Sequence, residues 1–378
     1  MDTLLSSGKR VRSIATIVSG ILRCWSRVEP VPAPLAAVLD QDGWERLAGA
    51  AEREGVAGLV HRALHHDPCA VLVPSAVRLR MQDVARTQAA AHAWEEAALG
   101  EVLDAFHARD LAPVVLRGHG LIASLYGSDG SLRPQLDHDL LVPKPDVHEA
   151  RRALRSMGFD TDGPLGDVFH RGTTTVDLHS DPYDRARVRS RGKVIRADAA
   201  AVVERAVPLT LAGRTVLQPC PADRVLLLCA HLVKHSFDRL IRMVDVAECC
   251  RRLRLDADAL ADQARAEGTA DALYYGLAAS AARAAAPAER LLARLSPRRR
   301  PRVERAFAEV LAGRPSPFFA ERLLLSQLDG WPERLAAVKE LFWTPEQRAR
   351  LRFGSTSGRL VAVPERVVTL ARRALAGP

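Results

Sequence analysis

The amino-acid sequence predicts an α+β protein in which a small α/β core lies between two helical regions. Short apolar runs that end at glycine or proline, as at residues 114–116 and 137–142, indicate strands in the middle of the chain. On both sides of this segment, apolar residues recur at helical spacing. We therefore divide the 378 residues into an N-terminal helical region (1–110), the α/β core (111–220) and a larger C-terminal helical region (221–378).

The N-terminal region shows a helical pattern from about residue 42. Asp42 is followed three residues later by Glu45, which resembles a capping box, and apolar residues recur at helical spacing between 56 and 64. After Pro74 a long helical pattern runs to about Asp110. This region is therefore predicted to consist of packed helices.

The core is predicted to begin with a strand, a tight turn and a helix. The apolar run 114–116 stops at Arg117-Gly118 and gives way to a helical stretch at 121–126. A polar loop then leads into a second strand at residues 137–142. Asp146 is the predicted cap of a following helix, which ends at Gly158.

Two hairpins are predicted in the second half of the core. Residues 168–171 and 173–179 flank Gly172, and residues 209–216 turn at 212–213. From Pro221 onward the pattern is helical again. The stretch 359–375 alternates basic and apolar residues, and we expect it to pack on the protein body rather than to lie on a membrane surface.

The composition is that of a globular protein, with 48% hydrophobic residues. None of the six cysteines forms a C-x-x-C pair, so we expect a reducing, cytoplasmic environment. The N-terminal segment 9–22 only faintly resembles a signal peptide, because its apolar part is short and interrupted. No run approaches the roughly 20 apolar residues of a membrane span.

The net charge of +9 comes almost entirely from arginine. Arginines scattered along helices are typical of solvated faces. The charge therefore permits a polyanionic partner, such as a nucleotide or RNA, without identifying one.

The strand at residues 137–142 carries the clearest chemical signal. Alternate side chains of a strand share a face, so Asp137 and Asp139 point one way while His138 points the other. Two carboxylates held this close repel each other unless a cation lies between them. Oxygen ligands suit a hard divalent ion, so we predict a metal site, although a D-x-D pair alone is also typical of solvated residues at the end of a strand.

Two further segments strengthen this prediction. Arg117-Gly118-His119-Gly120 lies where a strand meets a helix, and the free backbone N–H groups there favour an anion. Downstream, Asp177 and His179 share one face of the predicted hairpin strand. If that strand lies beside the strand of Asp137 and Asp139, Asp177 supplies a third carboxylate, and the three together can hold two metal ions.

These motifs in combination resemble the uncharacterised nucleotidyltransferase family of the polymerase-β-like superfamily. The resemblance spans most of residues 45–250 and rests on Glu54-Gly55-Val56, Val115-Leu116-Arg117-Gly118, Leu125-Tyr126, Leu132-Arg133, Asp137-His138-Asp139-Leu140-Leu141-Val142, Leu154 to Phe159, Asp177-Leu178-His179, His231, His235 and Asp245. The chain departs from the family where Arg117 replaces lysine, Leu136 replaces glycine and His138 replaces an aliphatic residue.

The resemblance implies a minimal nucleotidyltransferase fold with a mixed β-sheet. It implies that Gly118 belongs to the turn that holds the triphosphate, and that Asp137 and Asp139, with Asp177 as the third carboxylate, bind Mg²⁺ or Mn²⁺ and carry catalysis. We extend the nucleotide-binding set to Arg117, Gly118, Gly120 and Arg133, because the two arginines can neutralise phosphate charge.

The sequence thus predicts an enzyme that transfers a nucleoside monophosphate from an NTP to a hydroxyl or phosphate acceptor. The acceptor, which is a small molecule, a peptide or tRNA, and the oligomeric state remain open. One alternative is a toxin-like tRNA nucleotidyltransferase, and another is a non-catalytic protein that binds nucleotides or scaffolds a biosynthetic complex. A third is a metal phosphohydrolase centred on His231 and His235, with Asp245 on the next helix.

Overall fold

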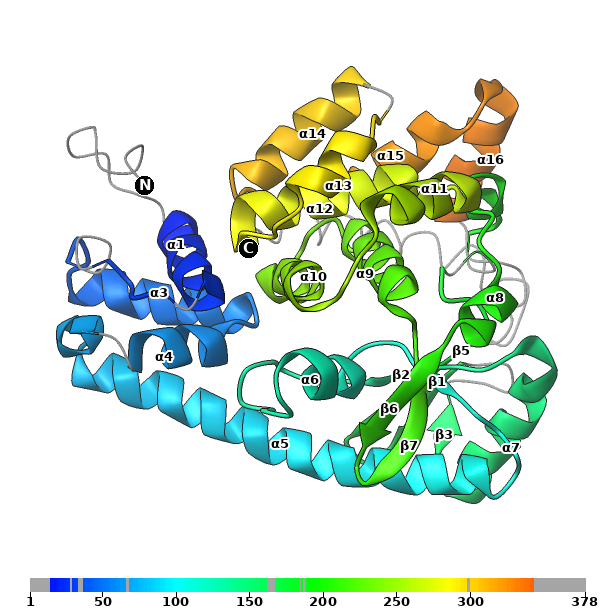
Figure 1. Cartoon of the computed structure of the whole chain (residues 1–378), viewed down its shortest axis with the longest axis horizontal. Coiled ribbons are helices and arrows are strands. Elements are labelled where there is room, and N and C mark those ends of the chain that lie inside the picture. The colour runs from blue at the N-terminus through cyan, green and yellow to red at the C-terminus, as the bar shows by residue number, and fades with distance from the viewer. Residues whose placement is uncertain are drawn as a thin grey trace.

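The computed structural model describes residues 14–342 apart from 28, 33–36, 66–67, 162–166, 184, 186–187 and 298–299. A mixed sheet of seven strands lies at one end of the molecule, and helices from both ends of the chain make up the rest (Figure 1). The predicted α+β class, with a mixed sheet between N-terminal and C-terminal helices, is confirmed.

The helices of the N-terminal region are α1 (Ile14–Arg27), α3 (Gln41–Arg53), α4 (Ala57–His65), the 3-10 turn η2 (Pro68–Leu72) and α5 (Ser75–His107). The 33-residue α5 matches the predicted long helix and runs from the other N-terminal helices to the sheet (Figure 1). The predicted capping box is wrong by two residues. The N-cap of α3 is Asp40, whose side chain accepts a hydrogen bond from the Gly43 amide, whereas Asp42 lies in the first turn.

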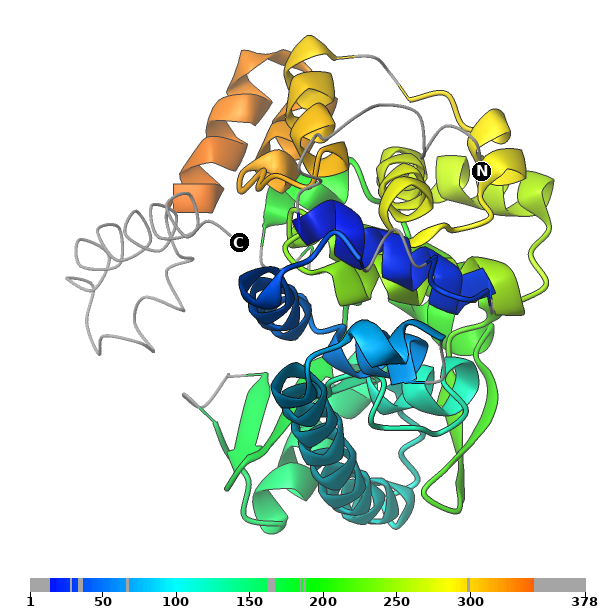
Figure 2. The same cartoon turned by 90° about the vertical axis from the view of Figure 1, so that its left-hand side faces the viewer.

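The apolar run near the N-terminus is part of the folded core. Ile17, Val18, Ile21 and Leu22 on α1 are each at most 2% exposed. They lie on a helix that packs against α3, α4 and α12 (Ala270–Ala284), and Figure 2 shows α1 between α4 and the C-terminal helices. Residues 14–22 of the segment that faintly resembles a signal peptide therefore contribute to the interior of this fold.

The strands are β1 (Val114–Val115), β2 (His138–Leu141), β3 (Asp160–Thr161), β4 (Val168–Arg171), β5 (Thr174–His179), β6 (Val207–Leu211) and β7 (Arg214–Gln218). Their order in the sheet is β3-β4-β5-β2-β1-β7-β6. The pairs β2–β5 and β1–β7 are parallel, and the other neighbours are antiparallel. Both predicted hairpins are confirmed as β4–β5 and β6–β7.

The predicted strand–turn–helix unit is also confirmed, because β1 leads through Gly118 into α6 (His119–Leu125). The next helix, α7 (Val147–Ser156), follows the 3-10 turn η3 (Lys144–Asp146) and is closed by Gly158 at φ +81°. Asp146 occupies the cap position of α7 but makes no capping hydrogen bond through its side chain. The start of α7 is therefore not stabilised by a side-chain cap at Asp146.

The remaining helices are η4 (Arg189–Lys193), α8 (Ala199–Glu204), α9 (Pro221–Lys234), α10 (Leu240–Arg252), α11 (Ala257–Glu267), α12, α13 (Glu289–Arg294), α14 (Pro301–Leu311), α15 (Phe319–Gln327) and α16 (Gly330–Phe342). One apolar core contains side chains from α1, α3 and α4 together with α9, α10 and α12. The predicted boundaries at 110 and 220 fall near the ends of α5 and β7, but the two helical regions share this core.

The two faces of the sheet differ in their partners. Leu140 and Val142 lie with Leu178 in an apolar cluster that includes the end of α5 and α7. Leu141 faces the other side, in a cluster with Leu227 of α9. This alternation is the one predicted from the sequence, and it directs the side chain of Asp139 toward the C-terminal helices.

None of the described helices is long and apolar enough to cross a membrane. The basic and apolar stretch 359–375, which we expected to pack on the protein body, lies outside the described residues.

Candidate active site

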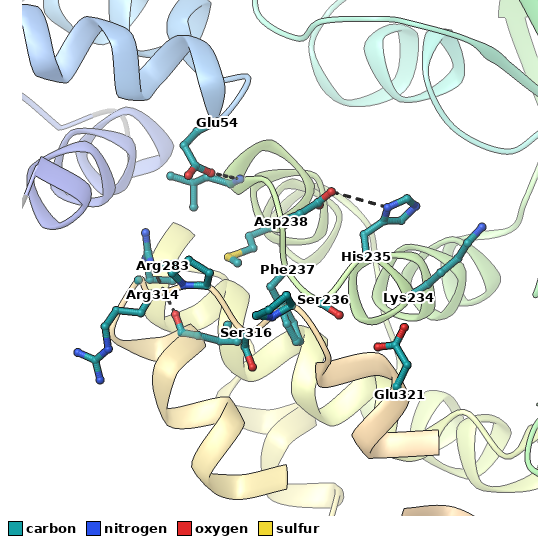
Figure 3. A pocket seen from close by; sticks show the side chains of 16 residues that line it. Glu54, Lys234, His235, Ser236, Phe237, Asp238, Arg283, Arg314, Ser316 and Glu321 are labelled. Atoms are coloured by element: carbon teal, nitrogen blue, oxygen red, sulfur yellow. Dashed lines mark hydrogen bonds and ion pairs between the residues drawn. The ribbon is translucent and has the colours of Figure 1, made fainter. Parts of the chain in front are cut away.

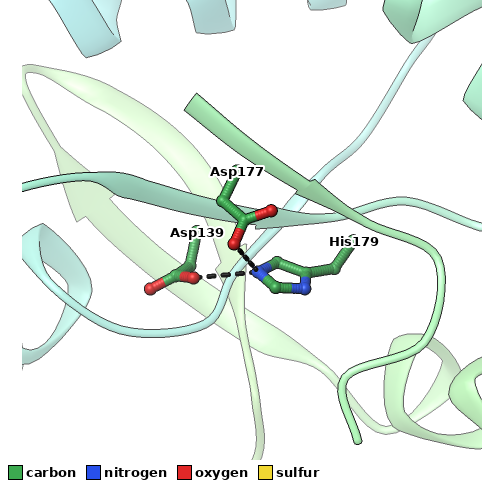
Figure 4. Close-up of side chains that lie close together, drawn as sticks. All are labelled: Asp139, Asp177 and His179. Atoms are coloured by element: carbon green, nitrogen blue, oxygen red, sulfur yellow. Dashed lines mark hydrogen bonds and ion pairs between the residues drawn. The ribbon is translucent and has the colours of Figure 1, made fainter. Parts of the chain in front are cut away.

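Three potential metal ligands meet where β2 lies beside β5. The two strands are parallel, with Asp139 directly opposite Asp177, and His179 follows on the same face of β5 (Figure 4). One ligand atom from each of these side chains lies within 4.8 Å of the others. Among the described residues, no other group of three His, Cys, Asp or Glu side chains meets this distance.

Asp139 is buried and is held from two sides. The Arg117 guanidinium donates from Nε to Oδ2 at 2.8 Å and from Nη2 to Oδ1, which makes the pair bidentate. His179 Nε2 lies 2.8 Å from Oδ1. Burial alone would raise the pKa of Asp139, but the Arg117 charge and the hydrogen bonds from His179 and Arg117 hold this pKa well below its usual range.

His179 is shifted in the opposite direction. Burial acts to lower the pKa of His179, but the hydrogen bond to Asp139 and the negative charges of Asp139 and Asp177 raise it above its usual value. Its Nε2 also lies 3.4 Å from Asp177 Oδ2. His179 and Arg117 therefore both interact favourably with the buried Asp139 carboxylate.

Asp137 has a different environment from Asp139. It lies just before β2 rather than within it, and it is exposed at the mouth of the cleft. Partial desolvation and the negative charge of Asp139 raise the pKa of Asp137. Asp137 is not one of the three residues whose ligand atoms converge, although it lines the same cleft.

The cleft beside these carboxylates has a volume of about 340 Å³. Asp137, Asp139 and Asp177 line it on the side of the sheet. The cationic side chains that line it are Arg117, Arg133, Arg191, Lys234, Arg239 and Arg242, and His231 and His235 also contribute. One cleft thus combines carboxylates with a surplus of cationic groups.

The predicted phosphate turn has the backbone of a glycine-specific turn. Gly118 adopts φ +59° and ψ −116°, and a Cβ there would lie 2.3 Å from the Gln135 side chain. No other residue type fits this position. Gly118 lines the cleft, whereas Gly120 is buried within α6.

Arg133 is engaged in an interaction that the sequence does not reveal. Its guanidinium donates from Nε and Nη2 to the buried Asp245, at 3.0 Å from Nε to Oδ1, and the Tyr126 hydroxyl donates to the same oxygen at 2.8 Å. Arg133 lines the cleft while it is held by Asp245. Its predicted role in binding phosphate therefore stays a prediction.

The alternative metal site of the sequence analysis is not assembled by the described residues. His231 Nδ1 lies 2.5 Å from Arg117 Nη1, and burial with the Arg117 charge lowers the pKa of His231 well below its usual value. Asp245 is engaged by Arg133. Among the described residues, His231, His235 and Asp245 do not form a three-ligand group.

Two features of the site were missed by the sequence analysis. The first feature is His179 as a potential metal ligand. The sequence predicted that His179 shares a face with Asp177, and this i, i+2 spacing in a strand was a signal that His179 lies beside the carboxylates. The second feature is the contact of Arg117 with Asp139 and His231, which are 22 and 114 residues away in the sequence. No local pattern indicates such a contact.

Comparisons with known proteins bear on this arrangement. The family model described as "Uncharacterised nucleotidyltransferase" matches residues 40–284, which is about two thirds of the chain and includes the sheet and the cleft carboxylates. The comparisons with curated proteins and with solved structures gave no match. Asp139 and Asp177 lie side by side on parallel strands within the matched residues. Because the family model matches about two thirds of the chain, this chain belongs to the uncharacterised nucleotidyltransferase family.

Proposed function

We propose that this protein is a metal-dependent nucleotidyltransferase that moves a nucleoside monophosphate from an NTP to a hydroxyl or phosphate acceptor. The observation that carries the proposal is the cleft itself, in which three aspartates and several cationic side chains face one space of about 340 Å³. A metal–triphosphate complex needs both kinds of group, because the metal binds carboxylates and the phosphates bind cations. The family membership supports the same class of reaction.

The residues present fit a divalent cation. Asp139 and Asp177 offer carboxylate oxygens and His179 offers an imidazole nitrogen, and these ligand atoms converge within 4.8 Å. This donor set suits Mn²⁺, and with water and phosphate ligands also Mg²⁺. When bound, such a cation would neutralise the triphosphate and lower the pKa of the acceptor hydroxyl.

The protein's own residues would then position the reactants. Arg191, Arg239 and Arg242 line the cleft and would bind the triphosphate, for which Arg242 would have to exchange its ion pair with Asp238. Gly118 allows the backbone of the turn to approach phosphate oxygens, since it carries no side chain there. Asp177 is the candidate base for the acceptor hydroxyl. Its side chain is more exposed than that of Asp139, and its contact with His179 is longer than the contact of Asp139 with Arg117.

The test is a calorimetric titration of the protein with ATP, GTP, CTP and UTP, each with and without Mn²⁺ or Mg²⁺. We expect metal-dependent binding that is lost in Asp139→Asn, which removes a charge from the three converging ligands, and retained in Asp160→Asn, a matched control in β3 outside the cleft. Transfer is then followed with α-labelled NTP and the RNA, peptide and small-metabolite fractions of a lysate. The labelled fraction identifies the acceptor class, and label in tRNA would favour the toxin-like alternative.

One observation favours a second candidate, a non-catalytic nucleotide-binding protein. Both oxygens of Asp139 already accept hydrogen bonds from Arg117, and Oδ1 also contacts His179. If these contacts persist with nucleotide bound, Asp139 has little capacity left for a metal. Metal-independent NTP binding without transfer to any fraction would support this candidate and reject the proposed enzyme.

A further inference from the structure

His231 on α9 lies at the wall between two spaces. Its side chain is partly buried and lines the cleft that contains the three aspartates. It also lines a smaller pocket of about 80 Å³, where the other side chains are mainly apolar. The cleft and this pocket share the lining residues Arg117, Arg191, His231 and Lys234. The three converging metal ligands do not include His231, so its position in the cleft requires another explanation.

The contact with Arg117 determines which ring nitrogen of His231 carries the proton. Arg117 Nη1 lies 2.5 Å from His231 Nδ1. A guanidinium has five N–H groups and no acceptor, so Nδ1 must be unprotonated and must accept this hydrogen bond. A neutral imidazole carries a single N–H, which in this tautomer is on Nε2. The Nε2 atom of His231 is therefore a hydrogen-bond donor.

The surroundings of His231 keep its ring neutral. Burial lowers the pKa of His231 well below its usual value, and repulsion from Arg117, His235 and Arg242 lowers it further. The charge of Asp139 acts in the opposite direction but is the smallest of these influences. Neutrality is also what the Arg117 contact requires, because a protonated ring would present an N–H to the guanidinium.

The Nε2 donor of His231 has no acceptor within the described part of the chain. It is also not one of the side-chain atoms that are fully buried without a partner, so it keeps accessible surface. A donor that is accessible at the wall of a cleft can bind a ligand without rearrangement of the protein.

The charges around this donor favour an anionic acceptor. Arg117, Lys234 and Arg242 line the cleft together with His231. The positive potential that keeps the ring neutral also attracts an anion. Arg117 contacts both Asp139 and His231, and the two ring nitrogens point away from each other, so Nε2 is directed away from the carboxylates. The donor thus lies beyond Arg117, where a phosphate meets cations rather than aspartates.

His235, one helical turn further along the chain, has a different partner. Its Nδ1 lies 3.7 Å from Asp238 Oδ2, and its ring lines both the cleft and a second cavity of about 270 Å³ (Figure 3). A carboxylate beside Nδ1 favours a proton on that nitrogen, whereas Arg117 excludes a proton from Nδ1 of His231. The two histidines are therefore not equivalent, although their ring centroids are 4.4 Å apart.

We propose that Nε2–H of His231 donates a hydrogen bond to the β- or γ-phosphate of the bound NTP, and that Arg117 positions this donor by fixing the tautomer of the ring. The proposal rests on the proposed function. The α-phosphorus is the atom attacked in the transfer, so the α-phosphate must lie near the carboxylates that hold the cation. The β- and γ-phosphates then extend along the cationic wall, and His231 binds the part of the NTP that leaves as pyrophosphate.

Two substitutions separate the donor of His231 from its contact with Arg117. In His231→Gln the amide nitrogen can take the place of Nε2 and keep the donor. In His231→Asn the amide oxygen can take the place of Nδ1 and accept from Arg117, but the donor is lost. Binding of ATP and of inorganic pyrophosphate, each with Mn²⁺, is measured on the full chain by calorimetry, and urea unfolding of each variant excludes loss of the fold as the cause.

We expect His231→Asn to weaken the binding of both ligands at least tenfold and by similar factors, because the lost hydrogen bond is made to a charged group that both contain. His231→Gln should retain affinities within threefold of the parent. His148→Asn is the matched control, since His148 is exposed on α7 outside the cleft, and it should change neither affinity.

Several results would overturn the assignment. Parent-like pyrophosphate binding in His231→Asn with a loss in His231→Gln would show that His231 only supports Arg117. A loss for ATP without a loss for pyrophosphate would place the donor at another part of the nucleotide, and a parent protein that binds neither ligand would also reject the proposal.

A second measurement tests the tautomer without any nucleotide. Nitrogen NMR of the isotope-labelled protein should show His231 protonated at Nε2, with its signals assigned by their absence from His231→Asn, and a proton on Nδ1 would contradict the proposal. Transfer of label from NTP judges the proposed function separately. A protein that binds pyrophosphate through His231 but transfers no label would retain this inference and reject the proposed enzyme.

Discussion

Replacing Asp139 by asparagine should destabilise the protein far more than the same replacement at Asp137. From the D-x-D spacing alone the two residues are equivalent, but in the structure only Asp139 belongs to a buried ion pair. The side chains of Arg117 and Asp139 are 12% and 7% exposed, and their contact is bidentate. Removing one partner of a buried pair costs about 3–5 kcal/mol, because the other charge is left uncompensated.

We expect a loss near 3 kcal/mol for Asp139→Asn, since asparagine still offers one oxygen to Arg117. Asp137 is exposed at the cleft mouth, and an exposed substitution changes stability by about 0.5 kcal/mol or less. Urea unfolding followed by tryptophan fluorescence measures both values, because the chain contains five tryptophans. Equal midpoints for the two variants would refute the reasoning, as would a larger loss in Asp137→Asn.

Four further predictions follow from the site and its surroundings. Asp177→Asn should weaken Mn²⁺ binding, because Asp177 is one of the three converging ligands, and should lower kcat at least tenfold even at saturating Mn²⁺ and NTP. An unchanged rate of label transfer would reject the assignment of Asp177 as the third carboxylate. His179→Gln should lower Mn²⁺ affinity, measured by electron paramagnetic resonance, more than Mg²⁺ affinity, because imidazole is a better ligand for Mn²⁺. His231→Ala should not change the metal content of the purified protein, and stoichiometric zinc that disappears in this variant would restore the phosphohydrolase alternative. The last concerns His119, whose pKa is lowered to about 3 by burial and by the charge of His138. The unfolded chain, with a histidine pKa of about 6.5, then binds more protons than the folded protein below that pH. The contribution of His119 to stability should therefore be fully present above about pH 6.5 and fall by about 2 kcal/mol by pH 5. The loss of stability between these two pH values in urea unfolding should be smaller by about 2 kcal/mol in His119→Phe than in the parent protein.

Much of the fold could be predicted because its signals are local. The strand–turn–helix at Gly118, the hairpin around Gly172 and the long helix α5 each depend on residues that are close together in the sequence. The alternation in β2 also predicted that Asp139 faces away from His138, and that the facing side chains separate onto two sides of the sheet. The pairing of β2 with β5 had to be assumed, and the structure confirms it, whereas the pairing of β1 with β2 and β7 was not predicted.

The electrostatics of the site could not be predicted in this way. Arg133 reaches Asp245 across 112 residues, and Arg117 reaches His231 across 114. Such contacts depend on how α9 and α10 pack over the sheet, and hydrophobic periodicity does not determine which helix faces which strand. The sequence analysis therefore assigned both arginines to phosphate, whereas each has a partner within the protein.

The pairing of Arg117 with Asp139 has a consequence for how the proposed enzyme would bind its ligands. A cation at Asp139 and Asp177 must compete with Arg117 and His179 for the same carboxylate oxygens. A triphosphate in the cleft offers Arg117 another anionic partner, so nucleotide binding would favour release of Asp139 to the metal. Because such coupling is reciprocal, the metal would raise the affinity for nucleotide by the same factor as the nucleotide raises the affinity for metal. The ion pair that occupies Asp139 would thus make binding of metal and nucleotide cooperative, with Asp139 available to the metal mainly when the substrate is present.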